Sequence, residues 1–308
     1  MSKPYIIFSH YGYSSYLEYS LACARKTNPN SKLILLGDQN NVDVALRNGW
    51  DHEHADKYKS TMHTRFLRVF RNVSGNKHSN FKKGKNWLRY VFERWFFIED
   101  FLQKNSVERF WHFDSDTMIV DDLESHSNRL SQFDFTVQCN NMCLNGFIKK
   151  DVVTEFCNHI CTLFENPEYI TKQQYEFDNI NPHYAFTEMR AFNDYKKITK
   201  RPWIHLLHYQ RDMVFDDCLC QKHDFETINL PIGKTIKMMF SQKGSIYGIR
   251  RGEDTRFITV NLSWLPDSIF RWVLACLDNE TSSLSTVSYT LLDRTKGLLR
   301  NILRLFKK

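Results

Sequence analysis

The chain opens with two short apolar runs on either side of one longer segment, an arrangement that few folds accommodate. Residues 4–9 (PYIIFS) and 31–38 (SKLILLGD) are apolar almost without interruption, and residues 13–29 between them end at an Asn-Pro step. Uninterrupted apolar runs are typical of strands buried on both faces of a parallel sheet, and helices stop before proline. We therefore predict a strand–helix–strand unit that opens an α/β fold with a mostly parallel, Rossmann-like central sheet flanked by helices.

In folds of this kind the ligand lies at the carboxyl ends of the strands. Ser9, His10 and Tyr11 follow the first predicted strand, and Gly37 and Asp38 follow the second. We expect these five residues at the binding edge of the sheet. Further elements are predicted as helices over 60–71, 86–104 and 151–166 and as strands over 109–113, 133–138, 226–230 and 256–260, within a region 168–260 of otherwise mixed pattern.

The composition is that of a globular chain. Of its 308 residues 42% are hydrophobic, which is ample for a core, and the length suits one large domain or two small ones. No apolar run reaches the roughly 18–20 residues that cross a bilayer, and the first residues lack the features of a signal peptide. We predict a cytoplasmic protein whose eight cysteines, in spacings unlike those of zinc sites, stay reduced.

Positive charge is concentrated in two regions. Residues 57–109 hold 13 Lys and Arg against 4 Asp and Glu, and residues 286–308 hold 6 against 1. The first region suits an anionic substrate. The second has an apolar and a basic face, as in helices that lie on anionic membranes. We predict one domain over 1–277 and, over 278–308, a linker and an amphipathic helix that binds the inner membrane face or, alternatively, docks on the protein or a second copy.

Two aspartates follow the predicted strand 109–113, in the stretch VERFWHFDSDTMIVDD (107–122). In an extended chain Asp114 and Asp116 would point the same way, with Ser115 between them facing elsewhere. Two converging carboxylates repel unless a cation lies between them, and oxygen ligands suit Mg²⁺ or Mn²⁺, which keep positions for phosphate oxygens. The pattern therefore predicts a divalent metal that is held by Asp114 and Asp116 on a diphosphate.

Other interpretations of these features stay open. One aspartate would cap the following turn while the other is solvated. In a phosphatase-type Asp-x-Asp-x-Thr/Val motif the first Asp is a nucleophile, but this motif normally follows the first strand and has Thr or Val where this chain has Met118. The basic region 57–109 would suit nucleic acid, yet it lacks a recognisable docking motif. We expect no nucleic-acid partner.

The run FERWFFIEDFLQKNSVERFWHFDSDTMIVDDL resembles nucleotide-sugar-dependent glycosyltransferases of the GT-A fold, in which an aromatic helix precedes an apolar strand that ends in Asp-x-Asp. Similar features continue in NMCLNGFIKKDVVTEFCNHICTLF and FTEMRAFNDY, so that the resemblance covers about residues 4–265. It implies transfer of a sugar from a nucleoside-diphosphate sugar, of the UDP or GDP type, to a hydroxyl of a glycan or lipid-linked acceptor, as in polysaccharide biosynthesis.

The resemblance also implies roles for individual residues. Asp114 and Asp116 would contact the metal, the diphosphate and the donor ribose, and Asp116 would be catalytic. Glu188 would contact the acceptor and act as general base in an inverting enzyme; alternatively it is a solvated residue at a helix N-terminus. The residues implied in donor binding are Ser9, His10, Tyr11, Asp38, Arg65, Ser115, Asn145 and Gly146.

A basic segment precedes the predicted strand 256–260. Lys243, Arg250 and Arg251 lie there in SQKGSIYGIRRGED (241–254), which we read as a glycine-punctuated loop. Such a loop would close over the donor diphosphate as a lid or remain an exposed basic turn.

One departure from the family concerns the metal. Many relatives carry, near the end of the catalytic domain, a His that is a third metal ligand, but the comparable stretch FITVNLSWLPDSIF has Ser263 and Trp264 there. The third ligand would then be missing, replaced by water, or supplied by His183, His205 or His208. This gap leaves a second hypothesis, a catalytically degenerate GT-A scaffold that acts as a binding or assembly protein.

Overall fold

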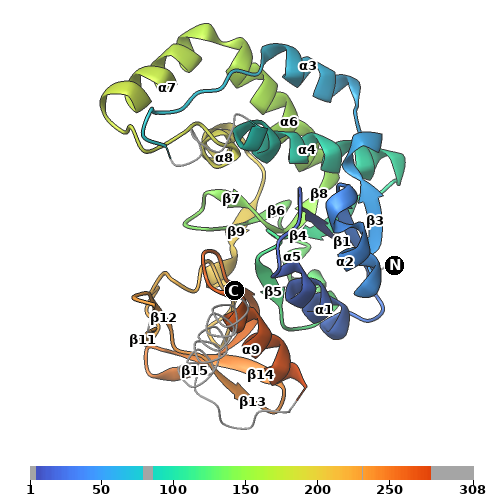
Figure 1. Ribbon diagram of the computed structural model, residues 1–308, viewed down its shortest axis with the longest axis vertical. Coiled ribbons are helices and arrows are strands. Elements are labelled where there is room, and N and C mark those ends of the chain that lie inside the picture. Colours follow the sequence, from blue (N-terminus) through green and yellow to red (C-terminus); the bar gives the residue numbers. More distant parts are fainter. Residues whose placement is uncertain (1–4, 79–85, 231, 279–308) are drawn as a thin grey trace, which may run out of the picture. The chain divides into compact units, whose positions relative to one another are not determined.

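The computed structural model describes residues 5–78, 86–230 and 232–278, which divide into two compact units (Figure 1). The division does not follow the order of the chain, because each unit is assembled from three separate segments. Each unit has its own sheets and its own core, so the two are described separately. Unit 1 is drawn from Met1–Tyr13, Ser31–Asp114 and Ser127–Ile204, and unit 2 from Ser14–Asn30, Ser115–His126 and His205–Lys308.

The central sheet of unit 1 has the strand order β3-β2-β1-β4-β8. Its first four strands are parallel, which confirms the predicted parallel sheet, and β8 pairs antiparallel with β4. The chain runs outward from β1 to β3 and then returns to place β4 on the other side of β1. The strand order therefore reverses between β1 and β4. The bounds are β1 (Tyr5–Ser9), β2 (Lys32–Gly37), β3 (Asp51–His54), β4 (Arg109–His112) and β8 (Gly146–Lys149).

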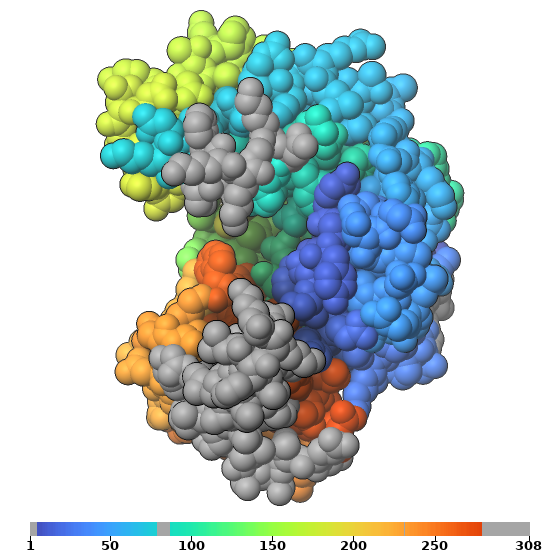
Figure 2. Space-filling model, in the orientation of Figure 1, coloured from blue at the N-terminus to red at the C-terminus, as the bar shows by residue number. Residues whose placement is uncertain are grey.

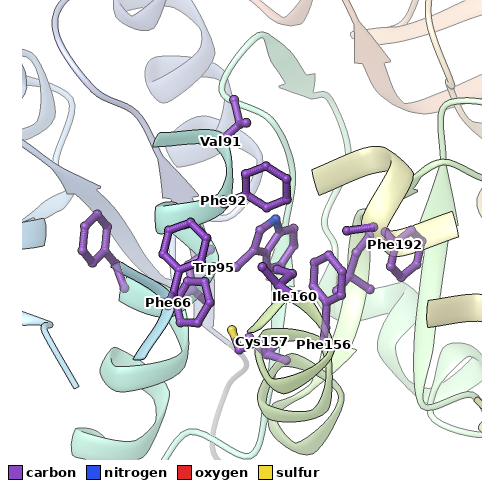
Figure 3. Close-up of a cluster of buried hydrophobic side chains, with 14 of the residues drawn as sticks. Phe66, Val91, Phe92, Trp95, Phe156, Cys157, Ile160 and Phe192 are labelled. Carbon is purple, nitrogen blue, oxygen red and sulfur yellow. The ribbon is translucent and has the colours of Figure 1, made fainter. Parts of the chain in front are cut away.

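Helices pack their aromatic side chains into the core of unit 1 (Figure 3). Phe92 is fully buried at the centre of this cluster, with its ring centroid 5.2 Å from that of Phe164 and 5.5 Å from that of Phe186. Burial of such rings supplies most of the driving force for packing a helix against its neighbours. The helices of the cluster are α3 (Thr61–Val69), α4 (Asn86–Lys104), α6 (Lys150–Glu165) and α8 (Glu188–Ile198).

The sequence predicted α3, α4 and α6, but it did not predict α7 (Pro167–Asn179). It gave a helix start at Glu188 only as an alternative; α8 does begin there, but Glu188 is buried and not solvated. Asn166 was read only as the end of a helix, whereas its side chain also accepts a hydrogen bond from Tyr169 N at 3.0 Å and caps the next one. Proline at the first helical position supports such a start. In Figure 2, α7 (yellow-green) lies beside the cyan segment that contains Ser74, whose carbonyl accepts from Gln174 at 3.2 Å.

Smaller elements complete unit 1. A second sheet of order β7-β6-β9 adjoins the helices, and β6 confirms the strand predicted at 133–138. These elements are β6 (Phe135–Gln138), β7 (Cys143–Leu144), β9 (Trp203–His205), α2 (Val42–Arg47) and α5 (Glu124–Leu130), of which β9 and α5 each cross into unit 2 at one end.

Unit 2 is built on a sheet of order β10-β15-β14-β13, in which β5 also pairs with β15. Helix α9 packs against this sheet in the core of the unit, where Trp272 is fully buried. The early helix α1 also belongs to unit 2. The bounds are α1 (Leu17–Thr27), β5 (Thr117–Ile119), β10 (Met213–Phe215), β11 (Thr227–Asn229), β12 (Thr235–Lys237), β13 (Phe240–Gln242), β14 (Ser245–Arg250), β15 (Glu253–Asn261) and α9 (Asp267–Leu277).

The expected loop over 241–254 was wrong, because this segment forms two successive β-hairpins. Lys243 and Gly244 connect β13 to β14, and Arg251 and Gly252 connect β14 to β15. All four residues have positive φ, between 51° and 80°. Two consecutive left-handed residues define the two-residue turn whose twist matches paired strands, so glycine here marks a tight turn and not a lid.

The predicted linker and C-terminal amphipathic helix (278–308) lie outside the described residues, apart from Asp278. Across the part of the chain that the structure describes, none of the helices has the length and apolarity needed to traverse a lipid bilayer.

Replacing Phe92 by Ala would leave a cavity at the centre of the aromatic cluster. We expect the free energy of unfolding to fall by about 3–5 kcal/mol, the usual cost of truncating a buried Phe, as measured by urea unfolding of the full chain. Leu67→Ala is the control: this side chain lies on the same group of helices but is 44% exposed, and its loss should change the same quantity by less than about 0.5 kcal/mol. Similar losses for both variants would contradict the packing described.

Candidate functional site

The reversal of strand order between β1 and β4 creates the position where open α/β sheets bind ligands. Ser9 closes β1, and Asp114 follows β4 after one intervening residue, so both lie at this carboxyl edge within unit 1. Because β1 pairs with both β2 and β4 in parallel register, the chain segments that leave the three strands meet at one edge. The sequence placed these residues correctly.

The segment after β1 is held by the end of β2. Gly12 N donates to Asp38 Oδ2 at 2.9 Å, and Asn41 Nδ2 donates to the carbonyls of His10 and Gly12, each at 2.9 Å. A Cβ on Gly37 would lie 2.0 Å from Asn41 Oδ1, so only glycine leaves room for this contact. Asp38 is buried and also accepts from Asn40 N, and it therefore shapes the edge by fixing the backbone.

The side chains of Ser9, His10 and Tyr11, at the end of β1 and directly after it, differ in exposure and in charge. Ser9 Oγ lies 3.0 Å from the hydroxyl of Tyr90 on α4. Burial lowers the pKa of His10 to about 4, although the Asp38 carboxylate acts in the opposite direction, so its imidazole is neutral at pH 7. Tyr11 is 63% exposed, with its ring centroid 5.1 Å from that of Tyr90. The edge thus presents an exposed aromatic ring beside a neutral histidine.

Arg94 of α4 joins two acidic residues that are far apart in the sequence. Its Nη1 donates to Asp114 Oδ1 at 2.6 Å and its Nη2 donates to Glu188 Oε1 at 2.8 Å. The side chains of Arg94 and Glu188 are 13% and 11% exposed, and that of Asp114 is 26% exposed. Charge-assisted hydrogen bonds of this length are among the stronger ones in proteins, so the three groups form one fixed cluster at the end of β4.

The pKa values of the two carboxyl groups in this cluster are shifted in opposite directions. Burial acts to raise the pKa of Asp114, but the Arg94 guanidinium, together with His112 and Asn145, outweighs it and holds that pKa below its ordinary value of 3.8. Burial raises the pKa of Glu188 above its ordinary value of 4.5, with Asp114 adding to the effect and Arg94 opposing it. A pair of carboxyl groups with separated pKa values can supply one permanent anion and one group that exchanges a proton.

A small cavity beside this cluster is lined by unsatisfied donors. Its volume is about 10 Å³, and Arg94, Trp95, Asn145 and Glu188 contribute to its wall. Arg94 Nε and Trp95 Nε1, which belong to two of these residues, are buried without a hydrogen-bond partner among the described residues, whereas the side chain of Asn145 interacts with Asp114. A buried donor without an acceptor costs roughly 1–3 kcal/mol. The cavity is therefore suited to a single acceptor oxygen, about the size of one water.

Asn145 and Gly146 were predicted together and lie together at the start of β8. Asn145 is 1% exposed, and it lies close enough to Asp114 to help lower the pKa of that carboxyl group. Gly146 has a φ of 96°, which side chains other than hydrogen rarely allow. The chain thus adopts, directly after Asn145, a backbone conformation that glycine permits.

The expectation that Asp114 and Asp116 lie in one extended stretch was wrong, because Ser115 and Asp116 form a turn. Asp116 belongs to unit 2, where its carbonyl accepts from Leu262 N at 3.0 Å and its Oδ2 accepts from Ser263 Oγ at 2.8 Å. Ser115 Oγ lies 3.4 Å from the hydroxyl of Tyr16. The segment noted for lacking the family's histidine thus places Ser263 against the second aspartate.

The carboxylate oxygens of Asp114 and of Asp116 are each ligands of the kind that Mg²⁺ and Mn²⁺ prefer. Across residues 5–78, 86–230 and 232–278, no three His, Cys, Asp or Glu side chains are grouped to hold a metal ion. Of the three histidines considered as a third ligand, His205 instead forms a hydrogen bond between its Nε2 and Asp217 Oδ1 at 2.8 Å, which the carboxylate accepts. His183 and His208 are exposed.

Two other predicted donor-binding residues have different surroundings. Arg65 Nε donates to Glu165 at 2.7 Å and its Nη1 donates to Asn158 at 3.2 Å, which links α3 to α6. Lys243 is exposed in the turn between β13 and β14. Neither is part of the Arg94 cluster.

Sequence reasoning missed Arg94 and a buried charged group in unit 2. Arg94 lies within the aromatic run of α4 and is followed by Trp95 and Phe96. A charged residue inside this aromatic run was the available signal. In unit 2, Asp216 and Lys237 are both fully buried and bonded to each other. The sequence feature that could have indicated this ion pair is the pair of aspartates directly after the apolar strand β10.

No protein-family model and no curated protein matches this sequence. Among solved structures, a cytidylyltransferase from Leptospira borgpetersenii serovar Hardjo-bovis (strain JB197) is similar with a TM-score of 0.34 and 12% identity, over 67% of this chain and 75% of that one. The PaToxG glycosyltransferase gives 0.33 and 10% over 64% and 69%. The glycosyltransferase GlyE of Streptococcus pneumoniae TIGR4 gives 0.32 and 12% over 67% and 45%.

Replacing Arg94 by Met would leave two buried carboxylates without their cation. We expect the free energy of unfolding at neutral pH to fall by roughly 3–5 kcal/mol, as measured by urea unfolding. Arg89→Met removes a guanidinium from the same helix, where the side chain is 46% exposed and pairs with Glu93; it should cost about 1 kcal/mol or less.

The loss caused by Arg94→Met should depend on pH. Asp114 has a lowered pKa in the folded wild type, so its contribution to stability is present above its ordinary value of 3.8 and disappears as the pH falls through the folded value. The difference between wild type and variant should therefore shrink on acidification. A difference that is constant down to pH 3 would contradict the ion pair.

Proposed function

We propose that the chain is a glycosyltransferase that moves a sugar from a nucleoside-diphosphate donor to an acceptor hydroxyl. The observation that carries the proposal is the cluster of Asp114, Arg94 and Glu188 at the carboxyl end of β4, beside the reversal of strand order. A donor bound there would meet a fixed anion, a fixed cation and a carboxyl group with a raised pKa. These are the charges that transfer from a diphosphate requires.

Asp114 and Asp116 are the proposed ligands of a divalent cation on the donor diphosphate. Only Ser115 separates them, so their Cα atoms stay within roughly 7 Å of each other in any conformation. The oxygen of Asp114 that Arg94 does not engage and the carboxylate of Asp116 would supply hard ligands suited to Mn²⁺ or Mg²⁺. The cation would neutralise charge on the leaving diphosphate.

The segment after β1 is the proposed nucleoside site. Tyr11 offers an exposed ring on which a base can stack, and His10, neutral at pH 7, can both donate and accept a hydrogen bond. Ser9 and Asp38 would hold this segment in place through Tyr90 and Gly12. Asn145 and Gly146 would lie beside the donor sugar, where the side-chain amide of Asn145 would bind a sugar hydroxyl.

Glu188 is the proposed general base, and a polar pocket of unit 1 next to it is the proposed acceptor site. This pocket has a volume of about 330 Å³, within the range of small-molecule sites. It shares Met142 with the small cavity that Glu188 lines. The rest of its wall, from α7 and α8, mixes donors and acceptors as hydroxyl-rich ligands require; the residues are Tyr169, Gln173, Arg190, Asn193, Asp194 and Lys197.

The acceptor in this proposal is a glycan, either free or lipid-linked. Attachment of residues 288–308 to an anionic membrane would bring a lipid-linked acceptor within reach, and it stays a prediction from the sequence.

A second candidate function, a scaffold of the same fold without catalysis, is favoured by the surroundings of the two aspartates. Arg94 already neutralises Asp114, and Ser263 already binds Asp116. If these contacts persist in the presence of a donor, the chain would bind nucleotide without a metal and without turnover. Metal dependence therefore separates the two functions.

A thermal-shift panel of UDP, GDP, CMP, dTDP and ADP, each with and without Mn²⁺, tests the proposal directly. We expect one nucleotide to raise the melting temperature only when Mn²⁺ is present, because binding to the folded state alone stabilises it. Asp116→Asn should remove the metal-dependent part of the shift. Asp43→Asn, an exposed aspartate in α2, should keep it. A flat response from folded wild-type protein would favour the scaffold.

Glu188→Gln tests the proposed base once the donor is known. We expect turnover, measured as release of nucleoside diphosphate, to fall by about 10²–10⁴-fold, while the nucleotide thermal shift is unchanged. Because the pKa of Glu188 is raised, the ionised base accumulates above pH 4.5 as the pH rises. Wild-type kcat/KM should rise over that range and the residual rate of the variant should not. Full activity of Glu188→Gln would exclude this role.

A further inference from the structure

Unit 2 contains a basic pocket formed by the β14–β15 hairpin and the segment that precedes β10. Its volume is about 540 Å³, and the hairpin lies among the orange-red strands of Figure 1. Guanidinium groups dominate the wall, which contains one acidic residue. The pocket is lined by His208, Gln210, Arg211, Arg250, Arg251 and Glu253.

The acidic residues around the pocket are already engaged. Glu253 lies opposite Arg250 in the strand register, yet its carboxylate is held by Arg211, through Nε at 3.0 Å and through Nη2. Arg251 Nη2 donates to Asp224 at 2.7 Å. No carboxylate within the described residues forms an ion pair with Arg250, which donates to the carbonyl of Leu207 at 3.3 Å.

Arg250 is held in place although no carboxylate within the described residues pairs with it directly. Its guanidinium carbon lies 5.5 Å from the centre of the Phe225 ring, over its face, and the side chain is half-buried. Burial and the neighbouring Arg251 lower the pKa of Arg250, and Asp224 acts in the opposite direction. A fixed, partly desolvated guanidinium beside other guanidinium groups is stabilised when an anion binds to it.

We propose that this pocket binds a phosphate ester or diphosphate, with Arg250 as the central contact and Arg211, Arg251 and His208 around it. The planar guanidinium donates two parallel hydrogen bonds to a phosphate, which an ammonium cannot do. The two-residue turn at Arg251 and Gly252 fixes the hairpin that carries the site. The phosphate belongs either to a soluble compound or to a lipid headgroup, and the chemistry of recognition is the same for both.

Isothermal titration of the full chain with inorganic pyrophosphate, in EDTA and at low salt, tests the proposal. Removing divalent cations suppresses any contribution from Asp114 and Asp116. We expect binding by wild type that weakens with added salt, and a loss of about tenfold or more in Arg250→Gln, the effect of removing hydrogen bonds to a charged group. Arg250→Lys, which keeps the charge but loses the two-bond geometry, should weaken binding to an intermediate degree.

Arg129→Gln is the matched control, since it removes the same charge from an exposed position in α5. It should change the pyrophosphate affinity by less than about twofold. Equal losses in Arg129→Gln and Arg250→Gln would show that only net charge matters and would overturn the proposal. So would an absence of binding by wild type, or binding that Arg250→Gln leaves intact while the variant keeps the wild-type melting temperature.

Vesicles identify the source of the phosphate. Sedimentation with phosphatidylcholine vesicles that contain phosphatidic acid, compared with vesicles that lack it, should fall in Arg250→Gln if the ligand is a lipid headgroup. Equal sedimentation of wild type and variant, together with pyrophosphate binding that needs Arg250, would identify a soluble phosphate ester. Because the proposed nucleotide shift depends on Asp114 and Asp116 and the pyrophosphate binding depends on Arg250, failure of one proposal leaves the other standing.

Discussion

The guanidinium of Arg94 determines the arrangement of the elements at the carboxyl edge of the central sheet in unit 1. Arg94 binds Asp114 and Glu188 together, and a buried cation is stable only while its partners stay in place. Three elements are thereby fixed to one another: α4 carries the arginine, the aspartate follows β4 after one intervening residue, and α8 starts at the glutamate. The aromatic packing of α4 does more than form a core, because it also determines where this charge lies.

The same arrangement gives the two acidic groups, Asp114 and Glu188, different protonation behaviour. A cation between two carboxylates would ordinarily keep both ionised, yet burial is strong enough at Glu188 to raise its pKa while Asp114 remains anionic. The nearby Arg94 Nε and Trp95 Nε1 lack acceptors within the part of the chain that the structure describes, so an incoming oxygen would meet unpaired donors at this edge. An arrangement that served stability alone would gain from satisfying these groups. Their state is consistent with selection for binding.

The sequence was informative wherever short-range patterns determine structure. Continuous apolar runs identified β1, β2 and β4, and with them the edge that carries Ser9 and Asp114. It was silent on Arg94, whose partners lie 20 and 94 residues away along the chain. It misread the turn at Ser115 and Asp116 because an Asp-x-Asp pair does not specify backbone conformation, and it misread the Lys-Gly and Arg-Gly steps because hairpin turns and open loops use the same residues.

The interleaved connectivity has a consequence for biosynthesis. The chain passes from one unit to the other five times, and α1 and β5, which are made early, belong to the unit that also contains β15 and α9. Since β5 pairs with β15, this early strand waits for a partner about 140 residues further along the chain, whereas unit 1 is complete at Ile204. Unit 1 can therefore assemble during translation while two segments of unit 2 still expose apolar surface. Truncation between residue 204 and β15 leaves those segments without the sheet and helix that cover them, and no single cut yields either unit as a continuous fragment.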